Sequence, residues 1–488
     1  MIPDWIEPAA LPVLVALLGA VAAGLAPGHR AGSWIVILAA GGAFAACVRL
    51  IWWQGSGVFF LVDPLSAHVA ILTAFVGLTT AWVSRDFVAV ELDAKGLEAG
   101  RLDARRVQQY HALLLAFLGF MLLALLSNNL GVTWVALEAA TISAVLVVGL
   151  PATADAVEAS WKYFILCGVG IALALFGTIV LYLAAAPALG GGSAAMTWTG
   201  LARAAPRCPG TLLNLAFVFM LVGYGTKAGL APLHGWMPDA HAEGPTPVSA
   251  VLSGSVLNVA LVVILRLRGV LAANAHAIDP RPPIMALGLL SVLLASFSLW
   301  GRRDVKRFFA FSTIEQQGLV AFALGLGGVT ATFAALLHMT MHTLAKSAVF
   351  HAVGRAVPRR GGQGFDRIAG MIASDRALGL LLAAGIVAVM GLPPFGLFAS
   401  EFLIVVETIR QHPWLVLPLA TGLLVGGWKL AARLCSLCLG EPGPQAGAPV
   451  GWAETLPGWL HLGVTIGLGL AMPVAFAGWL MAAASVAP

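Results

Sequence analysis

Apolar stretches of membrane-spanning length recur along the whole chain, and they constrain its fold more than any other feature. A helix needs about 20 apolar residues to cross a bilayer, and such stretches follow one another here with mostly short polar connections. The composition agrees, because 60% of residues are hydrophobic, only 10% are charged and the mean hydropathy is +0.93. Among spanning structures, helices satisfy all their backbone polar groups within one segment. The sequence therefore predicts an all-α, polytopic membrane protein.

About fourteen spans are expected from the lengths of these stretches and the Gly, Pro and charged residues between them. The predicted spans are roughly 9–27, 33–53, 65–84, 110–127, 129–150, 161–187, 211–240, 245–268, 283–300, 308–327, 330–354, 377–409, 413–438 and 458–483. This organisation divides the chain into three N-terminal spans with a polar loop (1–109), two five-span sets (110–268 and 283–438), and a linker with a last span (439–488).

Two spans are interrupted in corresponding ways. Span seven carries Lys227 and then Pro232, and span twelve carries Pro393, Pro394 and then Glu401. They are the fourth members of two sets, spans four to eight and spans nine to thirteen. Interrupted helices at matching places in two halves are typical of inverted repeats around a central ion site. The sequence therefore predicts an internal repeat of two five-span sets, with interruptions in spans seven and twelve.

Basic residues in the connections predict the orientation. They are concentrated in the odd-numbered connections, namely Arg30, Arg85, Lys95, Arg101, Arg105, Arg106, Arg302, Arg303, Lys306, Arg307, Arg355, Arg359, Arg360, Arg367, Arg376 and Arg433. Fewer lie in the even-numbered connections, namely Arg203, Arg207, Arg266, Arg268, Arg281 and Arg410. The positive-inside rule places the odd-numbered side in the cytoplasm, and an even span count then places both termini outside. The polar segment 84–109 is interpreted as a solvated or partner-contacting cytoplasmic loop, and 440–457 as a linker.

Charged residues inside the predicted spans are the candidates for function. A charge near the bilayer centre costs about 2.5–3.5 kcal/mol on insertion scales, so such residues normally face the bundle interior or a water-filled cavity. The six that matter most are Glu138, Lys162, Lys227, Glu315, Lys346 and Glu401. Lys162 lies near a span end, where its amine has the alternative of reaching the interface.

Span eleven carries a file of titratable side chains. His338, His342 and Lys346 are spaced i, i+4 and i+8, so they lie along one helical face, and His351 follows about one turn later. Imidazoles titrate nearest to neutral pH, which favours a proton relay over a set of merely packed histidines. A zinc site is disfavoured, because His338 and His342 lack the neighbouring Glu of HExxH and a third ligand.

Lys227 requires a partner, and Glu138 is the expected one. Movement of the carboxylate toward or away from the amine would load or release a proton, whereas a static buried ion pair is the alternative interpretation. His234 lies in the same interrupted stretch. The sequence contains no CxxCH, Walker lysine or iron–sulfur cysteine run, so no cofactor or metal is expected. The Cys435–Cys438 spacing is an isolated pair on a predicted membrane helix.

Several of these motifs together resemble one family. The segments that carry the resemblance are VDPLS at 62–66, KAGLAPLHGWMPDAHAEGPTPVSA at 227–250, HMTMHTLAKSAVFH at 338–351 and GLPPFGLFASEFL at 391–403. They are similar to the antiporter-like, proton-translocating membrane subunits of respiratory complex I and of multisubunit cation/proton antiporters. Within that family the chain most resembles the F component of hydrogenase-4. The resemblance implies fourteen helices and two inverted repeats.

The resemblance also implies roles for individual residues. Glu138 and Lys227 correspond to the family's ion pair, His338, His342 and Lys346 to its central relay, and Glu401 to the terminal group of helix twelve. Lys162, His234, Asn258 and Glu315 are secondary candidates. Asn258 is a departure, because the family usually has a titratable Lys or His there, and an asparagine either bridges the relay with water or interrupts it.

The expected function is proton translocation within a complex I-related, hydrogenase-4-like oxidoreductase complex in the cell inner membrane, with no redox chemistry in this chain itself. Its expected partners are other membrane subunits, the bilayer and protons or sodium, with no nucleic acid. Two alternatives stay open. One is a subunit of a sodium or potassium/proton antiporter or of an inorganic-carbon uptake system. The other is a non-pumping scaffold, which Asn258 favours.

Overall fold

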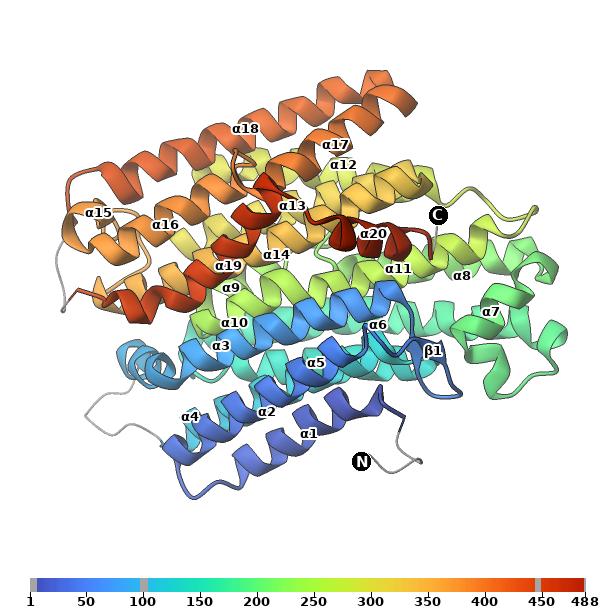
Figure 1. Ribbon diagram of the computed structural model, residues 1–488, viewed down its shortest axis with the longest axis horizontal. Helices are drawn as coiled ribbons and strands as arrows, with labels where there is room; N and C mark the ends of the chain where they lie inside the picture. Colours follow the sequence, from blue (N-terminus) through green and yellow to red (C-terminus); the bar gives the residue numbers. More distant parts are fainter. Residues whose placement is uncertain (1–6, 97–103, 444–448, 487–488) are drawn as a thin grey trace.

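A computed structural model describes residues 7–96, 104–443 and 449–486. The chain forms a bundle of helices that lie largely side by side, with the N-terminal helices at one edge and α18 at the other (Figure 1). The first half contains α1 (Ala10–Gly24), α2 (His29–Arg49), α3 (Pro64–Gly96), α4 (Ala104–Leu126), α5 (Leu130–Val148), α6 (Ala154–Leu189), α7 (Trp198–Ala204), α8 (Gly210–Lys227), α9 (Met237–Glu243), α10 (Thr246–Val251) and α11 (Leu257–Ala272). A two-residue antiparallel pair, β1 (Gly55–Ser56) and β2 (Leu61–Val62), precedes α3.

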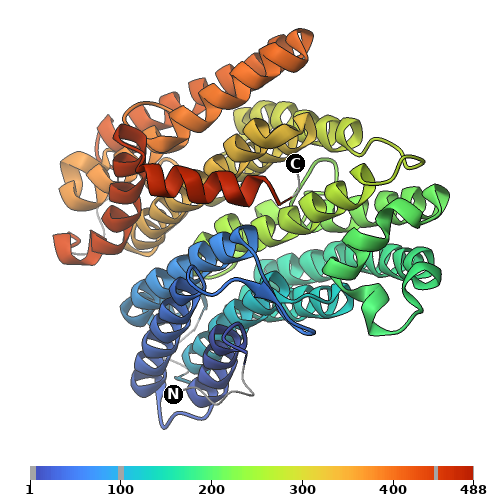
Figure 2. The same ribbon diagram turned by 45° about the vertical axis from the view of Figure 1, so that its right-hand side comes forward.

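The second half continues the bundle. It contains α12 (Arg281–Ser298), α13 (Val305–Leu326), α14 (Gly328–Arg359), α15 (Met371–Ser374), α16 (Arg376–Val389), α17 (Gly396–Gln411), α18 (Val416–Leu434), α19 (Trp452–Leu470) and α20 (Val474–Ala484). Figure 2 shows α8 to α14 between the N-terminal helices and the C-terminal group. The segment from α10 to α11 is buried, and α13 and α14 pack against each other beside it.

The predicted all-helical membrane fold is confirmed, although the predicted count of about fourteen spans is not. Within the described residues, nine helices are long and apolar enough to cross a membrane, and one bent pair could add a tenth. Every predicted span nevertheless coincides with a helix or a pair of helices. α13 and α14 are long enough but too polar for the hydropathy criterion, because they carry buried residues such as Glu315, His338 and Lys346. The residues that make α13 and α14 polar are therefore residues of the candidate site.

Predicted spans seven and twelve are each broken into two helices, as their interruptions predicted. α8 ends at Lys227 and the chain resumes helical form at α9, while α16 ends at Val389 and resumes at α17. Both breaks contain the pattern Gly-Leu-Xaa-Pro, and the glycines, Gly229 and Gly391, have φ of +70° and +65°. Glycine adopts this left-handed conformation without the steric cost that a Cβ would add. The two breaks thus share a sequence pattern and a backbone turn, as an internal repeat requires.

The last predicted span, 458–483, is not one straight helix. α19 and α20 meet at an angle of 92° across a break of a few residues. Pro473 stands directly before α20. A proline disfavours helical geometry in the residue that precedes it, so the chain turns there instead of continuing α19. Consequently α20 crosses α3 and α14 rather than extending along the bundle (Figures 1 and 2).

The two predicted connections are shorter than expected. The segment 84–109 is largely helical where it is described, because α3 continues to Gly96 and α4 begins at Ala104. Residues 89–95 include the strong helix formers Ala, Glu, Leu and Lys and neither Gly nor Pro, which favours the extension of α3. Its central part, 97–103, lies outside the described residues, and so do residues 444–448 of the predicted linker. α19 begins at Trp452, several residues before the predicted start of the last span.

Candidate functional site

Lys227 and Glu138 lie together at the first helix break. The Lys227 side chain is 1% exposed, and its Nζ is 3.8 Å from Oε2 of Glu138, which is 21% exposed. Nζ also donates a hydrogen bond to Thr141, one turn further along α5. Because Lys227 is the last residue of α8, its charge is close to the negative end of the helix dipole, which favours a cation. The structure therefore brings together the pair that the sequence predicted.

The break around Lys227 is held by contacts that the sequence did not reveal. Nε1 of Trp236 donates to the carbonyl oxygen of Thr226 at 2.9 Å, and its ring stacks on Tyr163 with centroids 4.3 Å apart. On the other side of the break, the backbone N–H of Ala231 donates to Oγ of Ser291 on α12 at 2.8 Å. His234 is partly buried near Phe311 and lies in this loop, not in a helix.

Asn258 joins three helices. It is the second residue of α11, which begins after a π-helical turn at Leu252–Val256, a distortion that is frequent at functional sites. Its Nδ2 donates to Oγ1 of Thr343 on α14 at 2.8 Å and also to the carbonyl oxygen of Gly254. Its Oδ1 accepts from Nε2 of Gln317 on α13 at 3.2 Å. The residue that cannot titrate is therefore the hydrogen-bonded link between α11, α13 and α14.

The file on α14 is buried and aligned as its spacing predicted. The rings of His338 and His342 are nearly parallel, at 6°, with centroids 6.3 Å apart. Nδ1 of His338 is 3.0 Å from Oγ of Ser400 on α17, and its Nε2 is 2.7 Å from Oε1 of Gln316 on α13. Nζ of Lys346 donates to the carbonyl oxygen of Phe309 at 2.9 Å. This stripe thus has hydrogen-bonding neighbours on α13 and α17.

Two carboxylates flank this file. Glu315 is 1% exposed, lies near Ser296 and interacts electrostatically with Lys346. Glu401 lies on α17 next to Gly391, and Gln316 lies beside its carboxylate. Gln316 therefore stands between His338 and Glu401. Neither Gln316 nor Gln317 was recognised from the sequence, although two adjacent amides beside Glu315 in an apolar span were a usable signal.

Lys162 lies outside this buried network. Its side chain is 47% exposed, and its Nζ is 2.7 Å from Glu158 and 3.0 Å from Asp239. Asp239 also pairs with Arg307 at 3.2 Å, in a surface pocket of about 180 Å³. The structure favours the interpretation in which the Lys162 amine reaches the interface, because the side chain is half exposed and pairs with Glu158 and Asp239 at the surface.

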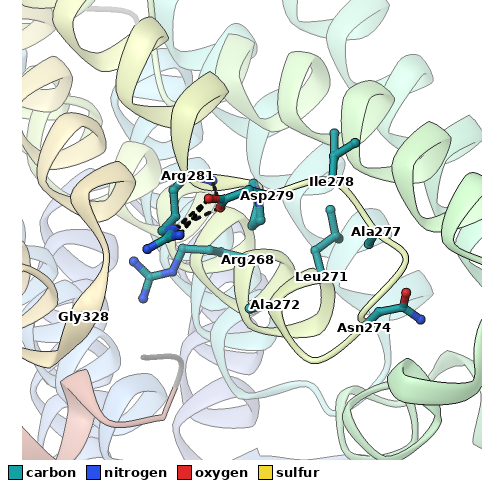
Figure 3. Close-up of a pocket in the computed structure, with 10 residues that line it drawn as sticks. Arg268, Leu271, Ala272, Asn274, Ala277, Ile278, Asp279, Arg281 and Gly328 are labelled. Atoms are coloured by element: carbon teal, nitrogen blue, oxygen red, sulfur yellow. Dashed lines mark hydrogen bonds and ion pairs between the residues drawn. The ribbon is translucent and has the colours of Figure 1, made fainter.

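A larger pocket of about 410 Å³ lies at the opposite end of the bundle, between α11 and the start of α12 (Figure 3). Arg281 donates hydrogen bonds to both carboxylate oxygens of Asp279 and lowers the pKa of that group below its usual value. Arg268 lines the same pocket and donates to Thr332 on α14 at 3.1 Å. Arg266 and Arg268 were assigned to a connection, but both lie within α11, where Arg266 pairs with Asp63 at 2.8 Å.

No group of three or more His, Cys, Asp or Glu side chains in the described part of the chain is arranged to hold a metal ion. The candidate site consists of titratable side chains and the amides between them. Charged side chains buried in this way inside a membrane bundle are typical of functional sites.

The helical bundle, its two helix breaks and its buried charges define a polytopic membrane protein with titratable groups in its interior, and the family follows from comparison. Residues 127–425 match the model of the transmembrane NADH:quinone oxidoreductase/Mrp antiporter family. The chain belongs to this family of antiporter-like membrane subunits.

Individual relatives are more specific. The chain is 44% identical over 472 residues to a hydrogenase-4 component F homolog of Methylacidiphilum infernorum, covering 96% of this chain and 98% of the relative. It is 29% identical over 401 residues to NADH-quinone oxidoreductase subunit 14 of Thermus thermophilus, covering 81% and 86%.

Solved structures share the fold. A chain of an archaeal membrane-bound sulfane sulfur reductase matches with a TM-score of 0.82 and 24% identity, covering 98% of this chain and 96% of that one. A chain of the Mrp complex from Dietzia sp. DQ12-45-1b matches with a TM-score of 0.81 and 20% identity, covering 98% and 97%.

Adjacent glycines on α18 provide a test of the Glu315 environment. A Cβ at Gly426 would collide with the Glu315 carboxylate, whereas a Cβ at Gly427 would meet nothing within 4 Å. Because Glu315 is 1% exposed, its carboxylate cannot turn aside into solvent, and we expect Gly426→Ala to destabilise the protein by about 1–3 kcal/mol, as overpacking does. Thermal unfolding of the purified chain in detergent measures this. Gly427→Ala is the matched control, and equal unfolding midpoints for the two variants would contradict the placement of Glu315.

Proposed function

We propose that this chain is a proton-translocating subunit of a complex I-related, hydrogenase-4-like membrane complex. One observation carries the proposal, namely a line of buried titratable and amide side chains through the middle of an apolar bundle. The first group is Glu138 with Lys227, and the second runs along α14 from Lys346 to His338 and on to Glu401. Asn258, hydrogen-bonded to α13 and α14, is the proposed link between them. The 44% identity to a hydrogenase-4 component F homolog supports the type of complex.

Each half of the line would hold and release its own proton. In the first half, the Glu138 carboxylate stabilises the charged form of Lys227, while the surrounding apolar atoms disfavour it. Withdrawal of Glu138 would therefore release a proton from the lysine. The partial exposure of Glu138 leaves its side chain within reach of a neighbouring subunit, which could move it.

In the second half, proton transfer would follow hydrogen-bonded side chains. Lys346 stores a proton next to Glu315, and the imidazoles of His342 and His338 lead from it along α14. Gln316 then connects His338 to Glu401, the exit candidate on the broken helix. The driving redox reaction would take place on partner subunits, and this chain would convert its energy into proton movement across the cell inner membrane.

Loss of either lysine should stop translocation. The assay uses inverted membrane vesicles and measures the acidification of their interior per molecule of electron donor consumed. The value obtained with vesicles that lack this chain is subtracted. We expect Lys227→Ala and Lys346→Ala to lower the remaining acidification about tenfold or more, because a positioned proton carrier commonly contributes 10²–10⁴ in rate. Lys429→Ala is the control, since that amine lies 3.4 Å from the Trp300 ring centroid, outside the relay. Wild-type coupling in both relay variants would exclude this function.

The scaffold alternative depends on Asn258. Asn258→Leu would remove the hydrogen bonds to Thr343 and Gln317, and with them the coupling between the two halves. We expect the same vesicle assay to lose about as much acidification as with Lys227→Ala, because the two halves of the network are then no longer connected. Asn258→Asp should retain most of it. If Asn258→Leu and Lys227→Ala both translocate normally, a non-pumping scaffold is the better description.

The orientation can be tested with introduced cysteines. Basic residues place the segment after α6 outside and the segment after α18 in the cytoplasm. In a Cys435→Ser background, we expect Ser193→Cys to react with a membrane-impermeant maleimide in spheroplasts, and Glu441→Cys only after permeabilisation. Both positions are exposed. The reverse pattern would invert the assignment of both termini to the outside.

A further inference from the structure

One helical face of α6 packs against the end of α8, beside the first ion pair. It carries Tyr163, Cys167 and Gly170, which are spaced i, i+4 and i+7. A Cβ at Gly170 would lie 2.7 Å from Cβ of Thr226, the residue before Lys227. One turn earlier on the same face, Cys167 interacts electrostatically with Lys227. This face of α6 therefore borders the buried lysine.

The Tyr163 ring is fixed by stacking, and its hydroxyl is buried. The side chain is 0% exposed, and its ring lies nearly parallel to that of Trp236, at 7°. Trp236 is itself held at the helix break by its hydrogen bond to the carbonyl oxygen of Thr226. Among the described residues, however, the Tyr163 hydroxyl has no hydrogen-bond partner. Buried hydroxyls are almost always hydrogen-bonded, and a phenylalanine would fill the same space without the desolvation cost, so packing alone does not explain a tyrosine here.

The Glu138 carboxylate is an unpaired acceptor on the neighbouring helix. Tyr163 interacts electrostatically with Glu138, and α5 packs against α6. Oε2 of Glu138 is 3.8 Å from Nζ of Lys227, which is an ion pair but exceeds hydrogen-bonding distance. This oxygen is buried, and in the part of the chain that the structure describes it has no hydrogen-bond partner either. An unpaired donor and an unpaired acceptor thus lie on two packed helices, next to the lysine.

The other neighbours of the pair are poorer donors for this carboxylate. The Thr141 hydroxyl accepts from Lys227 and donates to the carbonyl oxygen of Leu137 at 2.8 Å, so its proton is already used. The thiol of Cys167 is only a weak donor. Of these three neighbours, the phenol of Tyr163 is therefore the best donor for Glu138.

We infer that Tyr163 is a positioning residue that provides a second station for the Glu138 carboxylate. In the first state, Glu138 pairs with the ammonium of Lys227. In the second state, Glu138 accepts a hydrogen bond from the Tyr163 hydroxyl, and Lys227 loses its counter-ion. The ammonium then gives a proton to water and becomes a neutral amine, while the carboxylate keeps its charge and the phenol keeps its proton. This inference rests on the proposed function, and it names the group of this chain that holds the withdrawn carboxylate.

Tyr163→Phe tests the second station, because it removes the hydroxyl and keeps the ring on Trp236. Lys227 should then hold its proton more tightly, since its counter-ion is no longer drawn away. A hydrogen bond to a charged group changes an equilibrium about tenfold, so acidification per donor near neutral pH should fall about threefold or more in the vesicle assay. For the same reason, the optimum pH of the external medium should move upward by about one unit.

The pH profile reports on this pair because few other groups act on Lys227. Among the described residues, the titratable groups that interact with it are Cys167 on α6 and Glu138 on α5, and none comes from α11, which also packs on α8. Tyr163→Phe leaves both groups in place, so a shifted optimum reflects the lost station. A packing defect would instead lower the amount of chain in the membrane, or lower acidification at every pH without moving the optimum, and either result would overturn the station.

Tyr182→Phe is the matched control. Tyr182 lies on the same helix, about 28 Å further along its axis, and the substitution is the same. Its acidification and its pH optimum should equal those of the wild type. If Tyr163→Phe also keeps wild-type acidification and the wild-type optimum while Lys227→Ala fails, the station is overturned and the proposed function stands. Wild-type acidification in Lys227→Ala would overturn the proposed role of the lysine and the station together.

Discussion

The free energy of placing charge in a bilayer is the constraint on which this structure depends. An ammonium or carboxylate that faces lipid is costly, so charged residues within spans gather in the bundle interior, where other polar groups can surround them. Lys227, Glu315 and Lys346 are each 1% exposed or less. The helices that carry the central groups, α13 and α14, are consequently the ones that other helices enclose. The arrangement of the whole bundle around them follows from that requirement.

The two helix breaks meet the same requirement for the backbone. A break exposes N–H and carbonyl groups, which lipid cannot satisfy, so it must be covered by protein. At the first break, the side chains of Trp236 and Ser291 take up backbone groups of Thr226 and Ala231. At the second, Gly391 leaves room for the carboxylate of Glu401. Each break therefore brings a charged residue and freed backbone groups to the same buried place.

Amide and hydroxyl side chains then connect the charged groups. Asn258, Gln316 and Gln317 link α11, α13 and α14 by hydrogen bonds, and none of them titrates. Such groups can orient water and stabilise a passing charge at a smaller desolvation cost than another ion would incur. In the proposed relay, the amide at position 258 would therefore orient water and hold α11, α13 and α14 together.

Local sequence determined the parts of this protein that depend on neighbours in the chain. Apolar length predicted the helices, proline and glycine predicted both breaks, and i, i+4 spacing predicted the aligned face of His338, His342 and Lys346. Apart from the expected pair of Glu138 and Lys227, only the tertiary structure decided which groups meet across helices. It placed Lys162 at the surface, Gln316 between His338 and Glu401, and His461 against His351. These contacts join residues from 22 to 110 positions apart, and the packing of one helix on another leaves no periodic mark in either sequence.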